Sequence, residues 1–372
     1  MINKTCTIGI TGNIATGKSV IRRMLANAGA LGMDADVLAH RMYYPGGPAY
    51  QTVIQAFGTE ILSNQDQISS KKLGEIVFNH PDYLKQLEAI VHPLVEKTIL
   101  GRIQAAHRSL VALEAIKLLE ANLDQHCDYI WVSHAAPHQQ VQRLMQSRGF
   151  SEGQARLRIE SQTSQSNKLA RADVIINTEG NFKDTWRRTL TALNDTIQLA
   201  ENETPLYINS SNNWTTKNVG QIPYSQLEPS WTELSGETPS NLYAQLGSKV
   251  LCPLLKEDYI KAFLIWEDWN FSATLVKVYP KTILKEMPGL VLDVLEKQAL
   301  MGQSEILLIA ETLIRESGLV PDQFGFDFIE IDQFTYPAWK MAAVKSTGAE
   351  GTRVWTKILS QPFELQSEFM SK

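Results

Sequence analysis

Gly12-Asn13-Ile14-Ala15-Thr16-Gly17-Lys18-Ser19 is the stretch that decides the fold of this chain. It matches the pattern G-x-x-x-x-G-K-[ST], in which a buried strand ends in a glycine-bracketed turn and a helix follows at once. Residues 5–11 read as that strand, and residues 20–28 carry apolar side chains at helical spacing. The first N–H groups of a helix have no partner within it, so they favour an anion. The stretch therefore predicts a site for the phosphates of a nucleotide.

The residue types in this turn have separate roles in phosphate binding. Gly12 and Gly17 allow backbone conformations and close approach that a side chain would prevent. Lys18 would reach the outer phosphates, and the Ser19 hydroxyl would be a ligand for Mg2+. We expect the nucleotide to be bound by Gly12, Asn13, Ile14, Ala15, Thr16, Gly17, Lys18, Ser19 and Val20. An ordinary strand-to-helix turn is the alternative, and it leaves the adjacent Gly17-Lys18-Ser19 unexplained.

The composition is that of a globular protein with room for two domains. The 372 residues exceed the length at which single cores stop growing, and 44% of them are hydrophobic. A formal net charge of -5 argues against nucleic acid as a partner. No apolar run approaches the roughly 20 residues of a membrane span. Three widely spaced cysteines fit free thiols in a reducing compartment, so we expect a cytoplasmic protein without a membrane partner.

Apolar runs of strand length alternate with helical segments through the first 200 residues. After the first strand, further strands are expected at 30–33, 110–116, 128–133 and 173–177. Continuous apolar runs are typical of parallel strands covered on both faces. The alternation predicts a doubly wound parallel α/β sheet. Residues 69–107 read as helices with a break at His92-Pro93, and residues 137–168 read as two basic helices joined at Gly149.

Carboxylates follow two of the expected strands. Asp34 and Asp36 come where a strand ends and a helix begins, the side on which ligands bind in open α/β folds. Asp36 alone could be a helix N-cap, but beside a phosphate turn either aspartate is a candidate to accept the proton of an acceptor hydroxyl. Glu114, near the end of another strand, would hold a water on Mg2+ or simply lie at the strand edge.

Basic residues gather on the helices of 137–168. Such a run is usually a solvated face, but phosphate transfer needs a mobile, arginine-bearing cover that excludes water and spreads charge. The Asn-Lys-x-Asp sequence with which switch GTPases read guanine does not occur. The residues together predict a phosphoryl transferase rather than a simple nucleotide switch.

In these features the chain resembles the dephospho-coenzyme A kinase family. The shared marks occur in family order over about residues 5–200, and they include Gly9-Ile10-Thr11-Gly12, Asp34-Ala35-Asp36, Pro45-Gly46, Leu87-Glu88-Ala89-Ile90-Val91-His92-Pro93, Gln140 with Arg143, the turn after Arg148, Gln162 and residues 172–177. The resemblance implies a P-loop kinase domain at 1–200, with a helical acceptor-binding insertion at about 60–108 and a lid at about 137–168. It also implies transfer of the ATP γ-phosphate, with Mg2+, to the ribose 3′-hydroxyl of dephospho-coenzyme A, the last step of coenzyme A synthesis.

The resemblance implies roles for single residues as well. Asp36, Lys18 and Arg143 become the catalytic candidates, with Asp36 the better candidate for the base. Ser19 and Asp34 would be metal ligands, and Asn177 would lie near the adenine. Contacts with the acceptor would come from Thr11, Asp34, Asp36, His92 and Arg148. Two other interpretations are a related small-molecule or nucleoside kinase, and a nucleotide-binding regulatory protein whose C-terminal half is the working part.

The second half of the chain has no such marks. Residues 201–248 are polar and poor in periodicity, which predicts a linker region. Residues 249–372 predict a second α+β domain, with strands at 262–266, 271–279, 324–332 and 353–359 and helices at 290–300, 305–316 and 338–345. The order is faintly similar to that of acyl-coenzyme A dependent N-acetyltransferases, although Met301-Gly302-Gln303-Ser304 lacks their pyrophosphate-binding glycine pattern. A packing or partner-binding module is the other interpretation.

Overall fold

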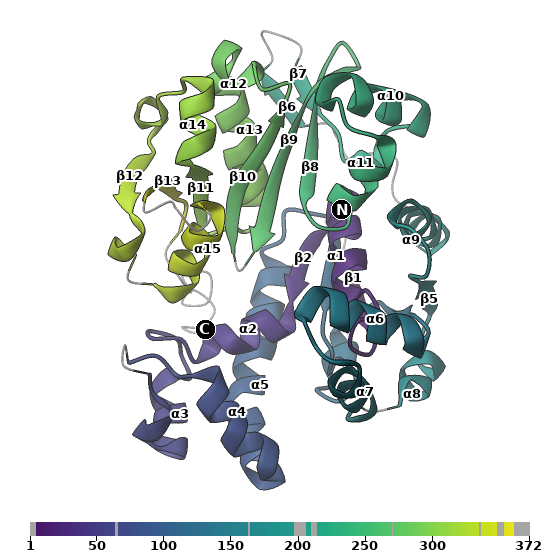
Figure 1. Ribbon diagram of the computed structural model, residues 1–372, viewed down its shortest axis with the longest axis vertical. Coiled ribbons are helices and arrows are strands. Elements are labelled where there is room, and N and C mark those ends of the chain that lie inside the picture. The colour runs from purple at the N-terminus through teal and green to yellow at the C-terminus, as the bar shows by residue number, and fades with distance from the viewer. Residues whose placement is uncertain are drawn as a thin grey trace.

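The protein is built on two sheets. The computed structural model describes residues 5–63, 66–162, 164–196, 206–209, 214–269, 271–334, 336–347 and 353–360. One sheet has five strands in the order β2-β3-β1-β4-β5, and the other has eight in the order β12-β13-β11-β10-β9-β8-β7-β6. Figure 1 shows the eight-stranded sheet in the upper half, with helices α3 to α5 and α6 to α8 projecting below on opposite sides.

The five-stranded sheet is parallel throughout and covered on both faces. Its strands are β1 (Cys6–Thr11), β2 (Leu31–Asp34), β3 (Leu110–Glu114), β4 (Tyr129–His134) and β5 (Val174–Asn177). Helices α1 (Lys18–Asn27) and α9 (Phe182–Thr196) pack on the face that presents Ile10 and Trp131. Helices α2 (Ala35–Met42) and α5 (Pro81–Gln104) pack on the face that presents Val111 and Leu113. The expected doubly wound α/β fold is therefore confirmed.

The helical segments differ in two details from the expectation. Helices α3 (Tyr50–Phe57) and α4 (Ser70–Asn79) precede α5, which runs unbroken through Pro93. The expected break at His92-Pro93 is wrong. A proline inside a helix removes one backbone hydrogen bond, and here the buried side chains of Val91 and Val95 hold the helix in place on both sides of Pro93. The basic segment forms three helices instead of two, α6 (Pro137–Arg148), α7 (Glu152–Glu160) and α8 (Gln165–Ala170).

The eight-stranded sheet is antiparallel except for the neighbours β10 and β11. Its strands are β6 (Leu206–Asn209), β7 (Trp214–Thr216), β8 (Val250–Lys256), β9 (Tyr259–Trp269), β10 (Ser272–Tyr279), β11 (Ile306–Ala310), β12 (Asp327–Glu330) and β13 (Arg353–Ile358). The accompanying helices are α10 (Tyr224–Ser235), α11 (Pro239–Leu246), α12 (Ile283–Glu286), α13 (Pro288–Met301), α14 (Glu311–Ser317) and α15 (Pro337–Thr347). The similarity of this half to N-acetyltransferases stays a prediction.

Two expectations for this half need correction. Residues 201–248 are more than a connection, because their described part contributes β6, β7, α10 and α11 to the second sheet and its cover. Residues 305–316 are not one helix, because 306–310 form strand β11 before α14 begins. The four side chains from Ile306 to Ile309 are fully buried, as in a strand covered on both faces, and a short apolar run does not distinguish that strand from a buried helix.

Helix α1 lies between the two halves. Its side chain Asn27 donates to the carbonyl oxygens of Leu246 and Lys249, at 3.1 and 2.9 Å, and accepts from the N–H of Leu251 at 2.8 Å. Met24 on the same helix packs in a core cluster that contains Trp186 and side chains of α10, α11, β8 and β9. The second half is therefore joined to the nucleotide-binding half by buried contacts. Among the described helices none has the length and apolar character needed to span a membrane.

Candidate active site

The phosphate turn connects β1 to α1 in a conformation that two glycines make possible. Gly12 has φ of 144° and Gly17 has φ of 95°, values that side chains disfavour. A Cβ on Gly12 would lie 2.4 Å from Ser133 Oγ and 2.7 Å from the Ser133 carbonyl oxygen. Ser133 belongs to β4 and is hydrogen-bonded to Thr16, with 2.6 Å between their Oγ and Oγ1 atoms. The neighbouring strand therefore fixes the shape of the turn.

Lys18 lies folded against this turn. Its side chain is almost fully buried, and Nζ donates to the Asn13 carbonyl oxygen at 3.1 Å. Burial lowers the pKa of Lys18, while the carboxylates of Glu114 and Asp36 act in the opposite direction. Because the two buried acids favour its charged form, Lys18 is suited to contact an anionic phosphate.

Ser19 is bonded to an acid that comes from β3. Its Oγ donates to Glu114 Oε1 at 2.6 Å, and Arg22 Nε donates to Glu114 Oε2 at 2.8 Å. Burial acts to raise the pKa of Glu114, but Arg22 and the Ser19 hydroxyl outweigh it, so the pKa is lowered. The sequence singled out Glu114 without deciding its role. The structure brings it next to the serine of the phosphate turn.

The two aspartates after β2 have different surroundings. Asp34 Oδ1 accepts from the N–H groups of Asp36 and Val37, at 3.0 and 3.1 Å, so Asp34 rather than Asp36 is the N-cap of α2. Asp36 Oδ2 accepts a long bond, 3.4 Å, from the Ile116 N–H. Burial, with Glu114 close by, raises the pKa of Asp34 to about 6, and burial also raises that of Asp36 against the effects of the Ile116 N–H and Lys18.

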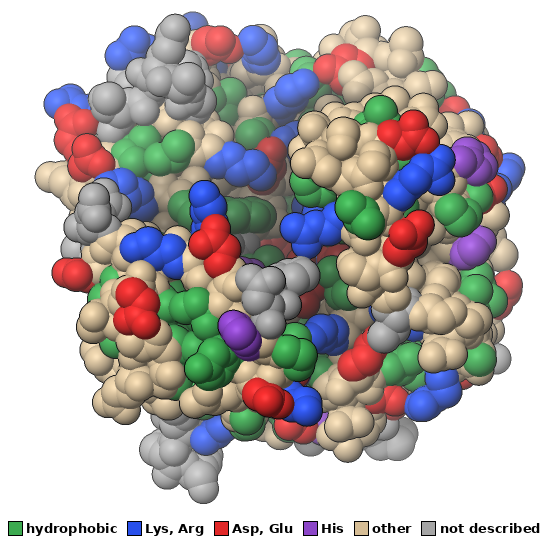
Figure 2. All heavy atoms as spheres, turned by 60° about the horizontal axis from the view of Figure 1, so that its bottom comes forward, with side chains coloured by type: hydrophobic (Ala, Val, Ile, Leu, Met, Phe, Trp, Pro, Cys, Tyr) green, Lys and Arg blue, Asp and Glu red, His purple; other side chains and the backbone are tan. Residues whose placement is uncertain are grey.

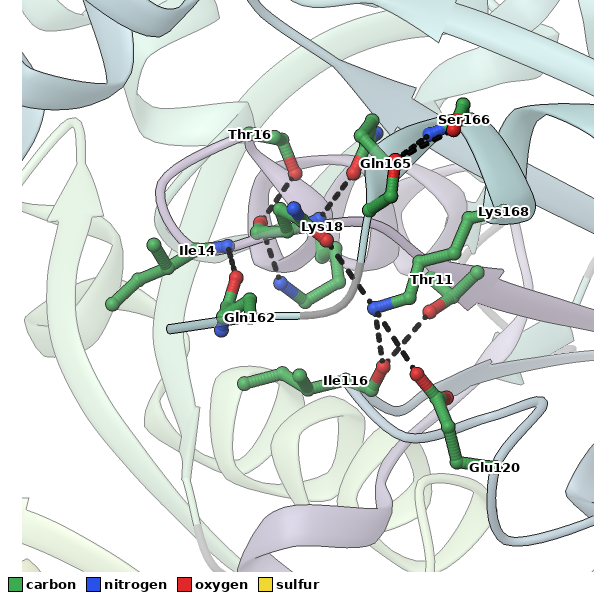
Figure 3. Close-up of polar contacts among 12 residues, drawn as sticks. Thr11, Ile14, Thr16, Lys18, Ile116, Glu120, Gln162, Gln165, Ser166 and Lys168 are labelled. Carbon is green, nitrogen blue, oxygen red and sulfur yellow. Dashed lines mark hydrogen bonds and ion pairs between the residues drawn. The ribbon is translucent and has the colours of Figure 1, made fainter. Parts of the chain in front are cut away.

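Residues of α8 and of the segment that precedes it reach the turn through amides and a cation. Gln162 Oε1 accepts from the Ile14 N–H at 2.6 Å, and Gln165 Oε1 accepts from the Asn13 N–H at 2.8 Å (Figure 3). Lys168 is 2% exposed, and its Nζ donates to the Ile116 carbonyl oxygen at 3.0 Å beside Glu120. Gln165 and Lys168 were missed as site residues, because glutamine and lysine are common on solvated helix faces and their spacing carries no distinct signal.

Arg143 on α6 bridges the turn and the segment after β5. Its guanidinium donates to the Ala15 carbonyl oxygen at 3.0 Å, to Thr178 Oγ1 at 3.0 Å and to the Thr178 carbonyl oxygen at 2.6 Å. Asn177 lies next to this contact, and its Oδ1 accepts from the Glu179 N–H at 2.7 Å. Arg143 and Asn177 thus lie at the edge of the turn; the roles that the family resemblance implies for them, a lid arginine and an adenine contact, stay predictions.

The remaining predicted residues lie at different distances from this group. Thr11 ends β1, and its Oγ1 donates to the Ile116 carbonyl oxygen at 3.2 Å (Figure 3). His92 is partly buried on α5, and Arg148 is exposed at the end of α6. Among the described residues, neither side chain joins the hydrogen-bonded group around the turn.

Figure 2 shows lysine and arginine side chains around a hollow near the middle of the lower face, a charge pattern that suits an anion.

The oxygen atoms around Ser19 suit a hard cation. Within the described residues, no three His, Cys, Asp or Glu side chains come together as a metal site. Mg2+ keeps several waters and is commonly bound by one or two protein oxygens together with substrate phosphates. The Ser19 hydroxyl, with the carboxylates of Asp34 and Glu114 beside it, fits that requirement.

A parallel sheet with a glycine-bracketed turn, a buried lysine and an arginine-bearing cover defines a P-loop kinase. The dephospho-CoA kinase family model (CoaE) matches residues 6–184. A dephospho-CoA kinase of Geobacillus kaustophilus is 40% identical over 192 residues, which are 51% of this chain and 96% of the relative. One of Geobacter metallireducens is 37% identical over 194 residues, which are 51% of this chain and 96% of the relative. The chain belongs to the dephospho-CoA kinase family, and it is a transferase.

The matched part of the chain is its first half. A crystal structure of a Thermus thermophilus protein is also similar, with 28% identity, a TM-score of 0.48, and coverage of 53% of this chain and 98% of its own. Family membership supports ATP use and a place in coenzyme A biosynthesis for the matched half.

Proposed function

We propose that the protein transfers the γ-phosphate of ATP to the ribose 3′-hydroxyl of dephospho-CoA. Residues 1–200 would be the kinase domain, with an acceptor-binding insertion at about 60–108 and a lid at about 137–168. The observation that carries the proposal is that the phosphate turn, with the buried Lys18 and with Ser19 bonded to Glu114 at 2.6 Å, has the two aspartates after β2 close enough to act on the charge of Lys18. Phosphate transfer needs such positioning and charge compensation rather than covalent chemistry by the protein.

Asp36 is our candidate for the base. Among the described residues its carboxylate accepts one long backbone bond, so it has room to accept a proton from an acceptor hydroxyl. Asp34 is less suited to that role, because the helix N-cap bonds hold its Oδ1. On the acceptor side we place Thr11, Asp34, Asp36, His92 and Arg148.

The donor side consists of the turn and its cover. Residues Gly12 to Val20 would cradle the phosphates, Lys18 would reach the outer ones, and Asn177 would lie near the adenine. Mg2+, held by Ser19 and Asp34, would reduce the charge on the phosphate oxygens. Arg143 would stabilise the transferring group, and its present bond to the Ala15 carbonyl oxygen puts it at the edge of the turn.

Incubation with ATP, Mg2+ and an acceptor tests this proposal. The acceptors are dephospho-CoA, its 3′-deoxyribose analogue and a nucleoside panel, and the products are identified by mass and by phosphorus NMR. We expect a 3′-phosphate on dephospho-CoA and no product from the analogue. Phosphorylation of a nucleoside instead would show that the chain is a different small-molecule kinase. ATP binding without any transfer would favour a regulatory protein.

A further inference from the structure

Glu305 connects the second sheet to two helices of the first half. It directly precedes β11, and its Oε1 accepts from Arg41 Nη2 at 2.6 Å and lies 3.7 Å from Arg102 Nη2. Its Oε2 accepts from Trp339 Nε1 at 3.2 Å. Arg41 belongs to the last turn of α2, and Arg102 to the last turn of α5. All three charged side chains are at most 4% exposed.

Other side chains of the second half complete this buried cluster. The guanidinium carbons of Arg41 and Arg102 lie 4.3 and 3.7 Å from the centre of the Phe271 ring. Arg102 Nη1 donates to Gln303 Oε1 at 3.2 Å, and Gln303 Nε2 returns a bond to the Arg102 carbonyl oxygen at 3.0 Å. Buried cations over an aromatic face, with hydrogen bonds in both directions, form a contact with a defined geometry.

The charge balance of the cluster makes Glu305 its critical member. Two buried guanidinium groups share this carboxylate, and burial lowers the pKa of Arg102 to about 10. Removing one partner of a buried ion pair leaves the other charge uncompensated, which is far more costly than losing a surface pair. The charge of Asp268 also acts on Arg102, but Glu305 is the carboxylate that approaches both guanidinium groups, so loss of its charge should destabilise the present placement of the ends of α2 and α5.

We propose that Glu305 is a positioning residue for the kinase site, through which the second half of the chain sets the place of α2 and α5. Asp36 lies in the first turn of α2 and Arg41 in the last, within one rigid eight-residue helix. At a rise of 1.5 Å per residue, Arg41 lies only about 7.5 Å along the helix axis from Asp36, so a displacement of the end of α2 should also displace Asp36. His92 shares α5 with Arg102. The inference rests on the proposed function, because Asp36 and His92 are assigned to the acceptor side there.

Glu305→Gln tests the proposal, because it removes the charge and keeps the size. The assay measures kcat and both KM values under saturating partner substrate. We expect the KM for dephospho-CoA to rise about tenfold or more with a loss of kcat, while the KM for ATP stays within about twofold. The difference arises because the cluster contacts α2 and α5, whereas the ATP phosphates would be held mainly by the phosphate turn and α1, with Asp34 as the one ATP-side residue that borders α2. Equal changes in both KM values would overturn the proposal.

Asn27→Ala is the matched control. It also removes buried polar bonds between the halves, but from the end of α1 and not from α2 or α5. Both variants should lose stability, and only Glu305→Gln should raise the KM for dephospho-CoA. If Asn27→Ala raises it equally, Glu305 acts through general stability and the proposal fails.

Hydrogen exchange supplies a readout that does not depend on turnover. In Glu305→Gln, amides of α2 and of the last two turns of α5 should exchange faster than in wild type, and those of α1 should not. If wild type fails to phosphorylate dephospho-CoA, the proposed function is wrong and this measurement alone decides the positioning role.

If Glu305→Gln does not fold, Trp339→Phe takes its place, since it frees one oxygen of Glu305 and keeps every charge. It should shift the same quantities in the same direction by less, and unchanged exchange would refute the proposal.

Discussion

Replacement of Asp36 by asparagine separates its chemical role from its structural one. Asparagine keeps an oxygen that can accept the Ile116 N–H, and the N-cap of α2 is unaffected because Asp34 provides it. The change therefore removes a proton acceptor and a charge while the fold of α2 persists. We expect turnover to fall by orders of magnitude with little change in ATP affinity.

The size of the loss follows from what a base contributes. General acid–base catalysis by a positioned side chain provides about 10²- to 10⁴-fold, which corresponds to about 2.7–5.4 kcal/mol of barrier at 1.36 kcal/mol per tenfold. Asp36→Asn also removes a negative charge near Lys18, which would slightly favour the polyphosphate. We therefore expect kcat to fall about 10²- to 10⁴-fold, and the dissociation constant for ATP to stay unchanged or to fall by no more than about twofold.

The assay combines single-turnover transfer to dephospho-CoA with calorimetric ATP binding. Asp82→Asn, which changes an exposed aspartate on α5, is the control and should match wild type. In wild type, burial raises the pKa of Asp36, so kcat should decline with falling pH at a higher pH than an ordinary aspartate would require. This decline should be absent from the residual activity of Asp36→Asn. Unimpaired turnover in the variant would refute the assignment and direct attention to Asp34.

Three further predictions concern the ionisation of Asp34, the shape of the phosphate turn and the dependence of the first half of the chain on the second. Asp34 has a folded-state pKa of about 6 against 3.8 for the free group, so its ionisation opposes folding increasingly as the pH rises between these values, and fully above them. Asp34→Asn, which keeps a good N-cap, should therefore stabilise the protein at pH 7 and not at pH 3.5 in urea unfolding, and an equal gain at both would contradict the reasoning. Gly12→Ala should abolish ATP binding in calorimetry, because its Cβ would lie 2.7 Å from the Ser133 carbonyl oxygen, and wild-type affinity would show that the turn adapts. Truncation after residue 204 should yield an aggregating or weakly folded fragment in size-exclusion chromatography, because it uncovers the apolar cluster around Met24, whereas a stable and fully active fragment would make the second half an appendage.

The phosphate turn and the parallel sheet could be predicted because their signals are local. Gly12 to Ser19 encode strand, turn and helix within a few residues, and apolar runs such as 110–114 reveal strands covered on both faces. The role of Asp34 as N-cap could not be separated from that of Asp36, because two aspartates at the start of a helix carry the same local preference. Only the backbone geometry of α2 decides which oxygen reaches the free N–H groups.

The features that were missed depend on partners far away in the chain. Glu305 is separated from Arg41 by 264 residues, and nothing around it distinguishes a buried anion from a surface residue at the start of a helix. The following apolar run fits either a strand or a helix, and the adjacent β10 and β13 select the strand.

The charge content of the interface argues that the two halves have a fixed relative placement. Apolar contacts such as those of Met24 tolerate small shifts, because dispersion and burial are nearly independent of direction. A carboxylate shared by two buried guanidinium groups does not tolerate such shifts. Each of its hydrogen bonds weakens steeply with misalignment, and an unpaired buried charge is costly. Buried ionic contacts contribute little net stability compared with apolar packing, so their contribution at Glu305 is best understood as orientation. The helix that they orient is the one that carries Asp36.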